Sequence, residues 1–148
     1  MLVAIGSDHG GFRLKEEIMK MLAAKGIAFR DVGTYSTESV DYPDISRSVG
    51  QAVASGECSR GIIVCGTGIG VCIAANKIKG IRAALCHDIF SAKMAREHND
   101  ANVLTLGERV IGTGPALMIV EKWLATEFAG GRHAGRVAKI TEMEEAGC

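Results

Sequence analysis

The chain has 148 residues, of which 47% are hydrophobic and 23% charged, an ordinary composition for one globular domain over residues 1–148. Lysine plus arginine equals aspartate plus glutamate at 17 each, so no overall charge attracts nucleic acid or an anionic membrane, and we expect neither as a partner. No stretch approaches the roughly 18 apolar residues that span a bilayer, and the N-terminus resembles a strand rather than a signal peptide. Five cysteines without CxxC spacing fit a reducing cytoplasm and argue against a disulfide framework or a zinc site.

The first part of the chain alternates strand and helix patterns. Residues 2–5 form a short apolar run typical of a strand, and residues 12–26 follow with helical spacing and Gly26 as a C-cap. The next segments predict a second strand at 28–33, a polar loop at 34–44 and a weaker helix at 45–57 closed by Gly56.

The second part continues this alternation. A third strand at 61–65 is followed by a glycine-rich turn and a helix through 73–78. The remaining segments predict strands at 82–86 and 102–106, helices at 89–99 and 115–128, and a short helix or loose tail at 140–148.

Local signals support the last two long helices. Asp88 is in position to N-cap the helix at 89–99, and Pro115 lies in the first turn of the helix at 115–128. The apolar stripe of that last helix consists of Leu117, Val120, Leu124 and Phe128.

Five β–α units of this kind predict an α/β fold, a Rossmann-like three-layer α/β/α sandwich with a five-stranded parallel sheet. The strands at 82–86 and 102–106 are continuously apolar, which favours burial on both faces. Ligands of such sheets lie beyond the carboxyl ends of the strands. This rule selects residues 6–11, 65–70, 86–88 and 107–109.

The turn after the third strand, CGTGIG at residues 65–70, is the strongest chemical signal. Its glycines let successive backbone N–H groups converge on an anion, and the start of the following helix favours a thiolate on Cys65. Cys65 is therefore a candidate proton acceptor with Thr67 beside it, although both also suit a buried strand end and a turn. A P-loop is excluded because no lysine follows the glycines. A dinucleotide fingerprint would need glycine at Val71, but Asp88 lies where a ribose-binding acid would, so that alternative stays open.

Two further polar pairs are candidates, each with a structural alternative. Asp8 and His9 follow the first strand, where an aspartate can equally cap a helix. His98 and Asn99 end the helix at 89–99, where a surface histidine interacts favourably with the helix dipole. Both pairs carry groups that can exchange protons or bind hydroxyls.

A basic cluster lies near the C-terminus, in GGRHAGR. Arg132 and Arg136 are four residues apart with His133 between them, so on a helix both arginines face one direction. Paired guanidinium groups match phosphate oxygens, although a solvated basic patch is the usual alternative. The short cluster fits one phosphate better than a nucleic-acid backbone.

Six segments carry a resemblance to a known family. They are, in order, IGSDHGGFRLK, GTYSTESVDYPD, CGTGIGVCIAANKIKGIRAA, REHNDANVL, GERVIG and WLATEFAGGRHAGRV. Together they resemble the type B ribose-5-phosphate isomerases and the related galactose-6-phosphate isomerase subunits, over nearly the whole chain. The resemblance implies an aldose–ketose isomerase that interconverts ribose 5-phosphate and ribulose 5-phosphate without metal or cofactor, and a strand order of 2-1-3-5-4.

The resemblance also implies catalytic roles. Cys65 moves a proton between C2 and C1 through an enediolate, and Thr67 assists proton movement at the oxygens. His98 opens the furanose ring, and Asp8 steadies the ring oxygen and hydroxyls. Relatives without the cysteine carry a glutamate base where this chain has Val71, so the chain resembles the cysteine branch.

The remaining candidates bind the substrate by the same resemblance. The enediolate is held by backbone amides of Gly66, Gly68, Ile69 and Gly70. The sugar is lined by Tyr42 and Asn99. The phosphate is bound by His9, Arg109, Arg132 and Arg136, with His133 nearby.

Members of the resembled family are homodimers, sometimes dimers of dimers, with sites shared between subunits. We therefore expect His98, Asn99 and a C-terminal segment of about 129–148 to reach a partner's site. Allose 6-phosphate or galactose 6-phosphate are alternative substrates, and a sugar-phosphate binding module without turnover is an alternative class. Cys65 and His98 in one chain favour the ribose enzyme.

Overall fold

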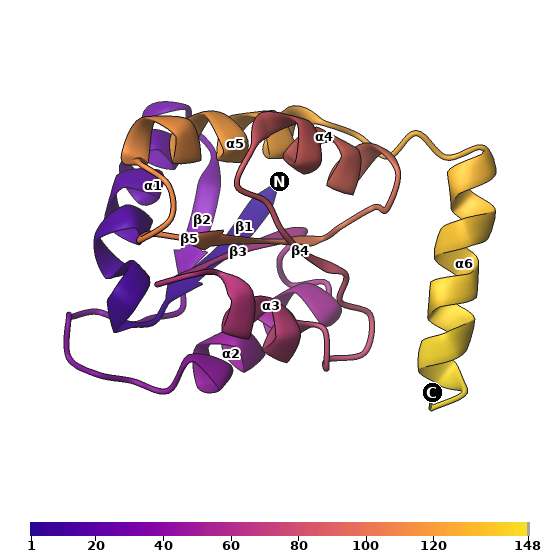
Figure 1. Cartoon of the computed structure of the whole chain (residues 1–148), viewed down its shortest axis with the longest axis horizontal. Coiled ribbons are helices and arrows are strands. Elements are labelled where there is room, and N and C mark those ends of the chain that lie inside the picture. Colours follow the sequence, from indigo (N-terminus) through magenta and orange to yellow (C-terminus); the bar gives the residue numbers. More distant parts are fainter. Residues whose placement is uncertain (148) are drawn as a thin grey trace.

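A computed structural model of the chain describes residues 1–147, so Cys148, expected to be an incidental thiol, lies outside the described residues. Strands and helices alternate from the N-terminus, with one short 3-10 turn, η1, after the first strand (Figure 1). In chain order the elements are β1 (Leu2–Ser7), η1 (His9–Gly11), α1 (Phe12–Ala24), β2 (Ala28–Asp31), α2 (Tyr42–Ala54), β3 (Arg60–Cys65), α3 (Ile69–Ala75), β4 (Ala83–Leu85), α4 (Ile89–Glu97), β5 (Val103–Gly107), α5 (Thr113–Ala125) and α6 (Arg132–Glu145).

The five strands form one parallel sheet in the order β2-β1-β3-β5-β4, which confirms the predicted fold and strand order. Helices α1, α4 and α5 cover one face, and α2 and α3 cover the other (Figure 1). The strand β3 lies at the centre and is buried along its whole length. Because all strands run the same way, their carboxyl ends meet at one edge, as the sequence analysis requires for a ligand site.

The core has one apolar layer on each side of the sheet. The larger layer contains Ile18 and Leu22 of α1 and Trp123 of α5, all fully buried. The smaller layer packs Val49 and Val53 of α2 against the other face. Burial of such side chains contributes about 1.5–3 kcal/mol each and makes the sheet a rigid base for the loops at its edges.

Two helix boundaries differ from the prediction. The helix predicted at 45–57 begins at Tyr42, because Pro43 lies in its first turn, where the fixed φ of proline suits a helix start. The helix predicted through 73–78 begins at Ile69, directly after Gly68, whose φ of 79° ends the preceding turn.

Two predictions about the second half of the sheet are also corrected. Strand β4 is only partly buried, because it forms the edge of the sheet; β5 is fully buried as predicted. Helix α5 ends at Ala125, so Phe128 does not continue the predicted stripe. The Arg60 guanidinium donates to the carbonyl oxygens of Trp123 and Leu124, at 3.0 and 2.8 Å, and this contact caps the helix end.

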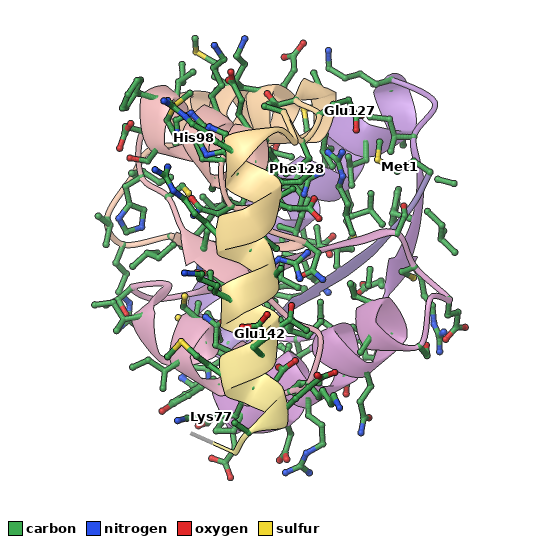
Figure 2. All side chains as sticks on the ribbon, turned by 90° about the vertical axis from the view of Figure 1, so that its right-hand side faces the viewer. Met1, Lys77, His98, Glu127, Phe128 and Glu142 are labelled. Atoms are coloured by element: carbon green, nitrogen blue, oxygen red, sulfur yellow. The ribbon has the colours of Figure 1, made fainter. Side chains whose placement is uncertain are left out.

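Helix α6 lies beside the three-layer body rather than in it (Figures 1 and 2). It spans Arg132–Glu145 and is longer than the short helix or tail predicted at 140–148. None of its residues is buried in the chain, and Ile140 and Met143 are 45% and 60% exposed. An apolar helix face open to solvent is a surface that another molecule can cover.

Candidate active site

Cys65 ends the central strand at the carboxyl edge and is 6% exposed. Its Sγ accepts a hydrogen bond from the backbone N–H of Gly68 at 3.0 Å. The turn can fold back onto the sulfur because Gly68 adopts a left-handed conformation, and a Cβ there would meet Leu106 backbone at 2.8 Å. A backbone N–H aimed at sulfur stabilises negative charge on it, which is what a proton-accepting thiolate requires.

Two other thiols, Cys86 at this edge and Cys58 before the start of β3, have different surroundings. Burial, followed by the nearby charge of Asp88, raises the pKa of Cys86 to about 12. Burial likewise raises the pKa of Cys58. Both groups stay protonated near neutral pH, so neither can serve as a base there.

The turn after β1 packs against the turn after β3. Asp8 donates its backbone N–H to Val64 O at 3.2 Å, and its Oδ1 accepts from Gly10 N at 2.8 Å. A Cβ on Gly10 would lie 3.1 Å from the backbone nitrogen of Gly66, so the two turns are in close contact. Asp8 therefore caps η1, its expected structural role, while its carboxylate lies beside the Cys65 turn.

His9 is tied to the loop after β2. Its Nδ1 accepts from the backbone N–H of Val40 at 3.3 Å. An imidazole nitrogen that accepts a hydrogen bond carries no proton, so the proton of the neutral ring is on Nε2, which is left free to donate. The sequence identified His9 but not the amide of Val40 that sets its tautomer.

Tyr42 and Thr67 both lie at the glycine turn. A Cβ on Gly70 would meet the Tyr42 ring at 2.8 Å, so the ring packs directly on the start of α3. Thr67 is exposed, and its Oγ1 accepts from Ile69 N at 3.3 Å. Both hydroxyls are thus at the same edge of the sheet as Cys65.

Arg109 lies over the glycine turn from the loop after β5. Its backbone N–H donates to Gly66 O at 3.0 Å, and a Cβ on Gly66 would lie 3.4 Å from the guanidinium Cζ. The neighbouring Glu108 donates its N–H to Cys65 O at 2.9 Å. The guanidinium is therefore held next to the candidate base.

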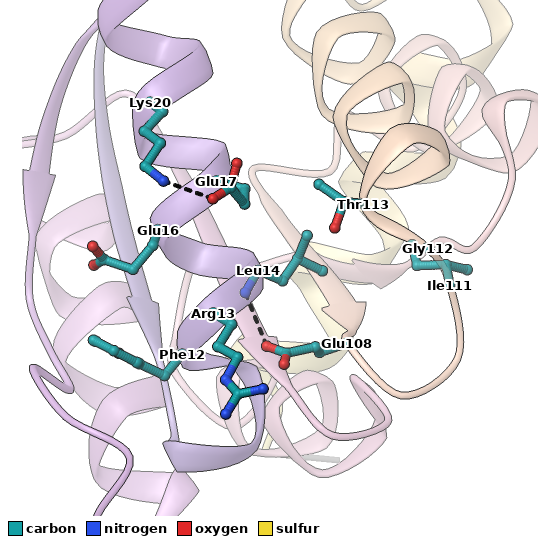
Figure 3. A pocket seen from close by; sticks show the side chains of 10 residues that line it. All are labelled: Phe12, Arg13, Leu14, Glu16, Glu17, Lys20, Glu108, Ile111, Gly112 and Thr113. Atoms are coloured by element: carbon teal, nitrogen blue, oxygen red, sulfur yellow. Dashed lines mark hydrogen bonds and ion pairs between the residues drawn. The ribbon is translucent and has the colours of Figure 1, made fainter.

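Glu108 falls in the selected range 107–109 but had no predicted role; its Oε2 accepts from Leu14 N at 2.9 Å (Figure 3). This hydrogen bond caps the first turn of α1 from a loop that lies 94 residues later in the chain. Leu14 and Glu108 also line a cavity of about 530 Å³. His87, in the selected range 86–88, likewise had no predicted role, and its Nε2 accepts from Gly107 N at 3.2 Å. Both contacts join distant segments, so no local pattern could have revealed them.

A second cluster lies where α4 ends and α6 begins. The rings of His98 and His133 stack with centroids 4.1 Å apart and planes 11° apart. Partial burial, followed by the charges of His98, Arg132 and Arg136, lowers the pKa of His133, and Glu97 opposes that shift. Arg132 and Arg136 are on the same exposed helix, and Asn99 follows His98.

The two clusters do not meet within the described chain. A helix that follows a parallel strand runs back along it, so α4 starts at Asp88 near the carboxyl edge and ends at His98 near the amino edge. The residues just after His98 confirm this position, because Asn102 O accepts from Gly61 N at the beginning of β3. At roughly 3.3 Å per residue, the two ends of β3 are about 17 Å apart.

Site residues of the sequence analysis thus fall into two groups. The carboxyl-edge group, which the fold brings together, contains Asp8, His9, Tyr42, Cys65, Gly66, Thr67, Gly68, Ile69, Gly70 and Arg109. The α6-side group contains His98, Asn99, Arg132, His133 and Arg136. We keep these two names below.

Asp88, the acid on which the dinucleotide alternative depends, is a helix cap in the structure. Both carboxylate oxygens of Asp88 are occupied at the start of α4, where they accept from Ser91 N at 2.7 Å and Ser91 Oγ at 2.6 Å. These bonds lower the pKa of Asp88. The residue is the predicted N-cap.

Residues 1–147 contain neither a metal-ligand cluster nor a membrane span. No three histidine, cysteine, aspartate or glutamate side chains are grouped so as to hold a metal ion. No helix in this range is long and apolar enough to cross a bilayer.

A five-stranded parallel sheet between two helical layers, with a buried thiol and a glycine turn at its carboxyl edge, defines a Rossmann-like domain with a candidate anion site at that edge. Comparison with known proteins makes the assignment specific. Residues 3–140 match the family described as Ribose/Galactose Isomerase, and the chain belongs to that family.

Individual relatives match over almost their full lengths. Ribose-5-phosphate isomerase B of Escherichia coli is 50% identical over 97% of this chain and 96% of its own. D-erythrulose-4-phosphate isomerase of Pectobacterium atrosepticum is 47% identical over 96% and 94%. The structure of ribose-5-phosphate isomerase B from Clostridium thermocellum superposes with a TM-score of 0.98 at 57% identity, covering 100% of both chains.

Proposed function

We propose that this protein is an aldose–ketose isomerase that interconverts D-ribose 5-phosphate and D-ribulose 5-phosphate. The environment of Cys65 carries the proposal. A nearly buried thiol receives a backbone N–H from a glycine turn, and a guanidinium lies over the same turn. Family membership and near-complete matches to ribose-5-phosphate isomerases support the same activity.

Cys65 acts as the base in this mechanism. The thiolate removes the proton from C2 of the open aldose and delivers it to C1, and the reverse reaction starts at C1 of the ketose. Removing a proton next to a carbonyl leaves a negative oxygen that must be held, and losing one oxyanion donor typically costs about 3–4 kcal/mol. The backbone N–H groups of Gly66–Gly70 are the candidates for this role, with Thr67 moving protons between the oxygens.

The phosphate of the substrate supplies binding energy remote from the reacting carbons. In the carboxyl-edge group, His9 donates to the phosphate from Nε2, and the Arg109 guanidinium above the glycine turn binds the phosphate. Asp8 and Tyr42 hold the sugar hydroxyls between the phosphate and the reacting carbons.

A furanose has no free carbonyl, so an acid–base group must open the ring before isomerisation. We assign this step to His98 of a second subunit in a homodimer, together with Asn99, Arg132 and Arg136 of that subunit. The support is topological, because α4 carries His98 to the sheet edge opposite Cys65 within one chain. The exposed α6, within the segment of about 129–148, is suited to reach across such a dimer.

The similar relatives differ in the sugar phosphate that their names give. They include a ribose 5-phosphate and a D-erythrulose 4-phosphate enzyme at similar identity. An assay panel of four-, five- and six-carbon aldose phosphates, including allose 6-phosphate and galactose 6-phosphate, separates these options. We expect highest kcat/KM with ribose 5-phosphate, and a cytoplasmic location.

The proposal is tested by exchange at C1 of ribulose 5-phosphate in D₂O, which requires the base but no ring opening, because this ketose cannot close to a furanose. Cys65→Ser should lower both exchange and net turnover by about 10²-fold or more, the lower range for a general base. Circular dichroism checks that the fold is kept. Near-normal exchange in the variant would remove Cys65 from the mechanism, and wild-type protein that binds ribose 5-phosphate without turnover would be a binding module.

A further inference from the structure

Helix α6 contacts the body at both of its ends. At the C-terminal end, both carboxylate oxygens of Glu144 accept from Gly80 N at 3.0 Å. Just before the helix begins, Ala129 N donates to Glu97 O at 3.0 Å, and one turn later His133 stacks on His98. Between these ends lies a groove of about 720 Å³ that Ile140 and Met143 line.

The stack is the side-chain contact that joins the end of α4 to the beginning of α6. Two nearly parallel rings at 4.1 Å restrict each other's rotation. Partial burial, followed by the charges of His98, Arg132 and Arg136, lowers the pKa of His133 and so favours its neutral ring. A flat neutral ring can pack against His98 whether or not His98 carries a proton.

The chemistry of ring opening demands a fixed spacing at this place. In a furanose 5-phosphate, the ring oxygen and the phosphorus are joined only through C4, C5 and the ester oxygen. An acid that protonates the ring oxygen must therefore lie close to the groups that bind the phosphate. His98 is on α4 and the arginines are on α6, so something must fix one helix to the other.

We propose that His133 is a positioning residue: its ring, stacked on that of His98, holds the ring-opening imidazole at a set offset from Arg132 and Arg136. This inference rests on the proposed function and gives His133 a role other than phosphate contact. The same spacing occurs in a hexopyranose 6-phosphate, where the ring oxygen and phosphorus are joined through C5, C6 and the ester oxygen. The stacked pair therefore sets the ring-opening step without selecting the length of the sugar.

Two substitutions separate positioning from phosphate contact. His133→Phe keeps a flat ring and removes the N–H donors, whereas His133→Asn keeps a donor and removes the ring. We expect His133→Phe to isomerise ribose 5-phosphate within about twofold of wild type. We expect His133→Asn to lose about three- to tenfold in kcat, the range that an aromatic stacking contact supplies.

Exchange at C1 of ribulose 5-phosphate should stay at the wild-type rate in both variants, because it bypasses ring opening. The ring protons of His98 give a second readout in the free protein. Their NMR signals should remain shifted by the stacked ring in His133→Phe and move in His133→Asn. Glu144→Ala, which releases only the far end of α6, is the matched control and should leave kcat for ribose 5-phosphate unchanged.

Each other outcome overturns the inference. A loss of turnover in His133→Phe, with or without one in His133→Asn, would mean that the imidazole N–H itself touches the substrate. Wild-type kcat in both variants would mean that the stack has no effect on ring opening. Absence of net isomerisation of ribose 5-phosphate by the wild-type protein would instead reject the proposed function, so the two failures are distinguishable.

Discussion

The carboxyl-edge group and the α6-side group are built in different ways. The first is fixed by the sheet, because Cys65 ends the central strand and the turns around it are joined by backbone hydrogen bonds. In the second, Arg132, His133 and Arg136 are on α6, which has no buried residue, and the stack of His133 on His98 joins them to the end of α4. In our proposal, one chain therefore completes the proton-transfer part of the site, and a second subunit supplies the ring-opening part.

The largest expected effect that separates the groups comes from His98. His98→Asn should lower kcat for ribose 5-phosphate by about 10²-fold, the lower range for general acid–base catalysis. Exchange at C1 of ribulose 5-phosphate should stay within a few-fold of wild type, because the carboxyl-edge group is intact. Stopped-flow turnover and NMR exchange measure the two quantities. Equal losses of turnover and of C1 exchange would mean that His98 also takes part in proton transfer, so that the two groups do not have separate roles.

An intermediate effect is expected from the phosphate arginines of α6. Arg136→Ala should raise KM for ribose 5-phosphate by about tenfold or more, because a hydrogen bond to a charged group contributes about 1.5–3 kcal/mol. Lys139→Ala, which removes a charge from the same exposed helix, is the matched control and should leave KM unchanged. If the two variants raised KM equally, the effect would be the general charge of α6 and not a phosphate contact.

A smaller effect, on stability, is expected on the carboxyl-edge side. Glu108→Ala should lower the free energy of unfolding by about 1 kcal/mol, because it leaves the N–H of Leu14 uncapped at the start of α1. Glu108→Gln keeps an acceptor and should recover most of the loss. Lys20→Ala, at the rim of the same cavity (Figure 3), removes only an exposed ion pair with Glu17 and should change stability by less than about 0.5 kcal/mol. Urea unfolding measures the free energy of unfolding of the three variants. Equal values for Glu108→Ala, Glu108→Gln and Lys20→Ala would contradict the capping role assigned to Glu108.

Local sequence patterns predicted most of the sheet and the carboxyl-edge group. Alternating apolar runs and helical spacing set the β–α order, and the glycines after β3 marked the turn around Cys65. The strand order needed the family resemblance, because a strand's neighbours in a sheet depend on contacts far apart in the chain. The same reason hid Glu108, whose partner is 94 residues away, and Val40, whose contribution is a backbone N–H.

The predictions were wrong where tertiary contacts determine the end of a helix or the burial of a strand. The end of α5 is set by the Arg60 guanidinium on its last carbonyls, so the apolar pattern through Phe128 overestimated its length. The burial of β4 was overestimated because apolar composition does not distinguish an edge strand from a central one. For the α6-side group, the sequence named the residues, but the stacking of His133 on His98 depends on two helices that only the fold brings together.

The most direct test of a site shared between subunits is to mix two inactive variants. Cys65→Ser supplies an intact His98, and His98→Asn supplies an intact Cys65. If each site combines the carboxyl-edge group of one subunit with the α6-side group of the other, random reassociation should restore about a quarter of wild-type turnover of ribose 5-phosphate, since half of the dimers are mixed and each has one intact site. Turnover that stays at the level of the separate variants after verified subunit exchange would contradict the account.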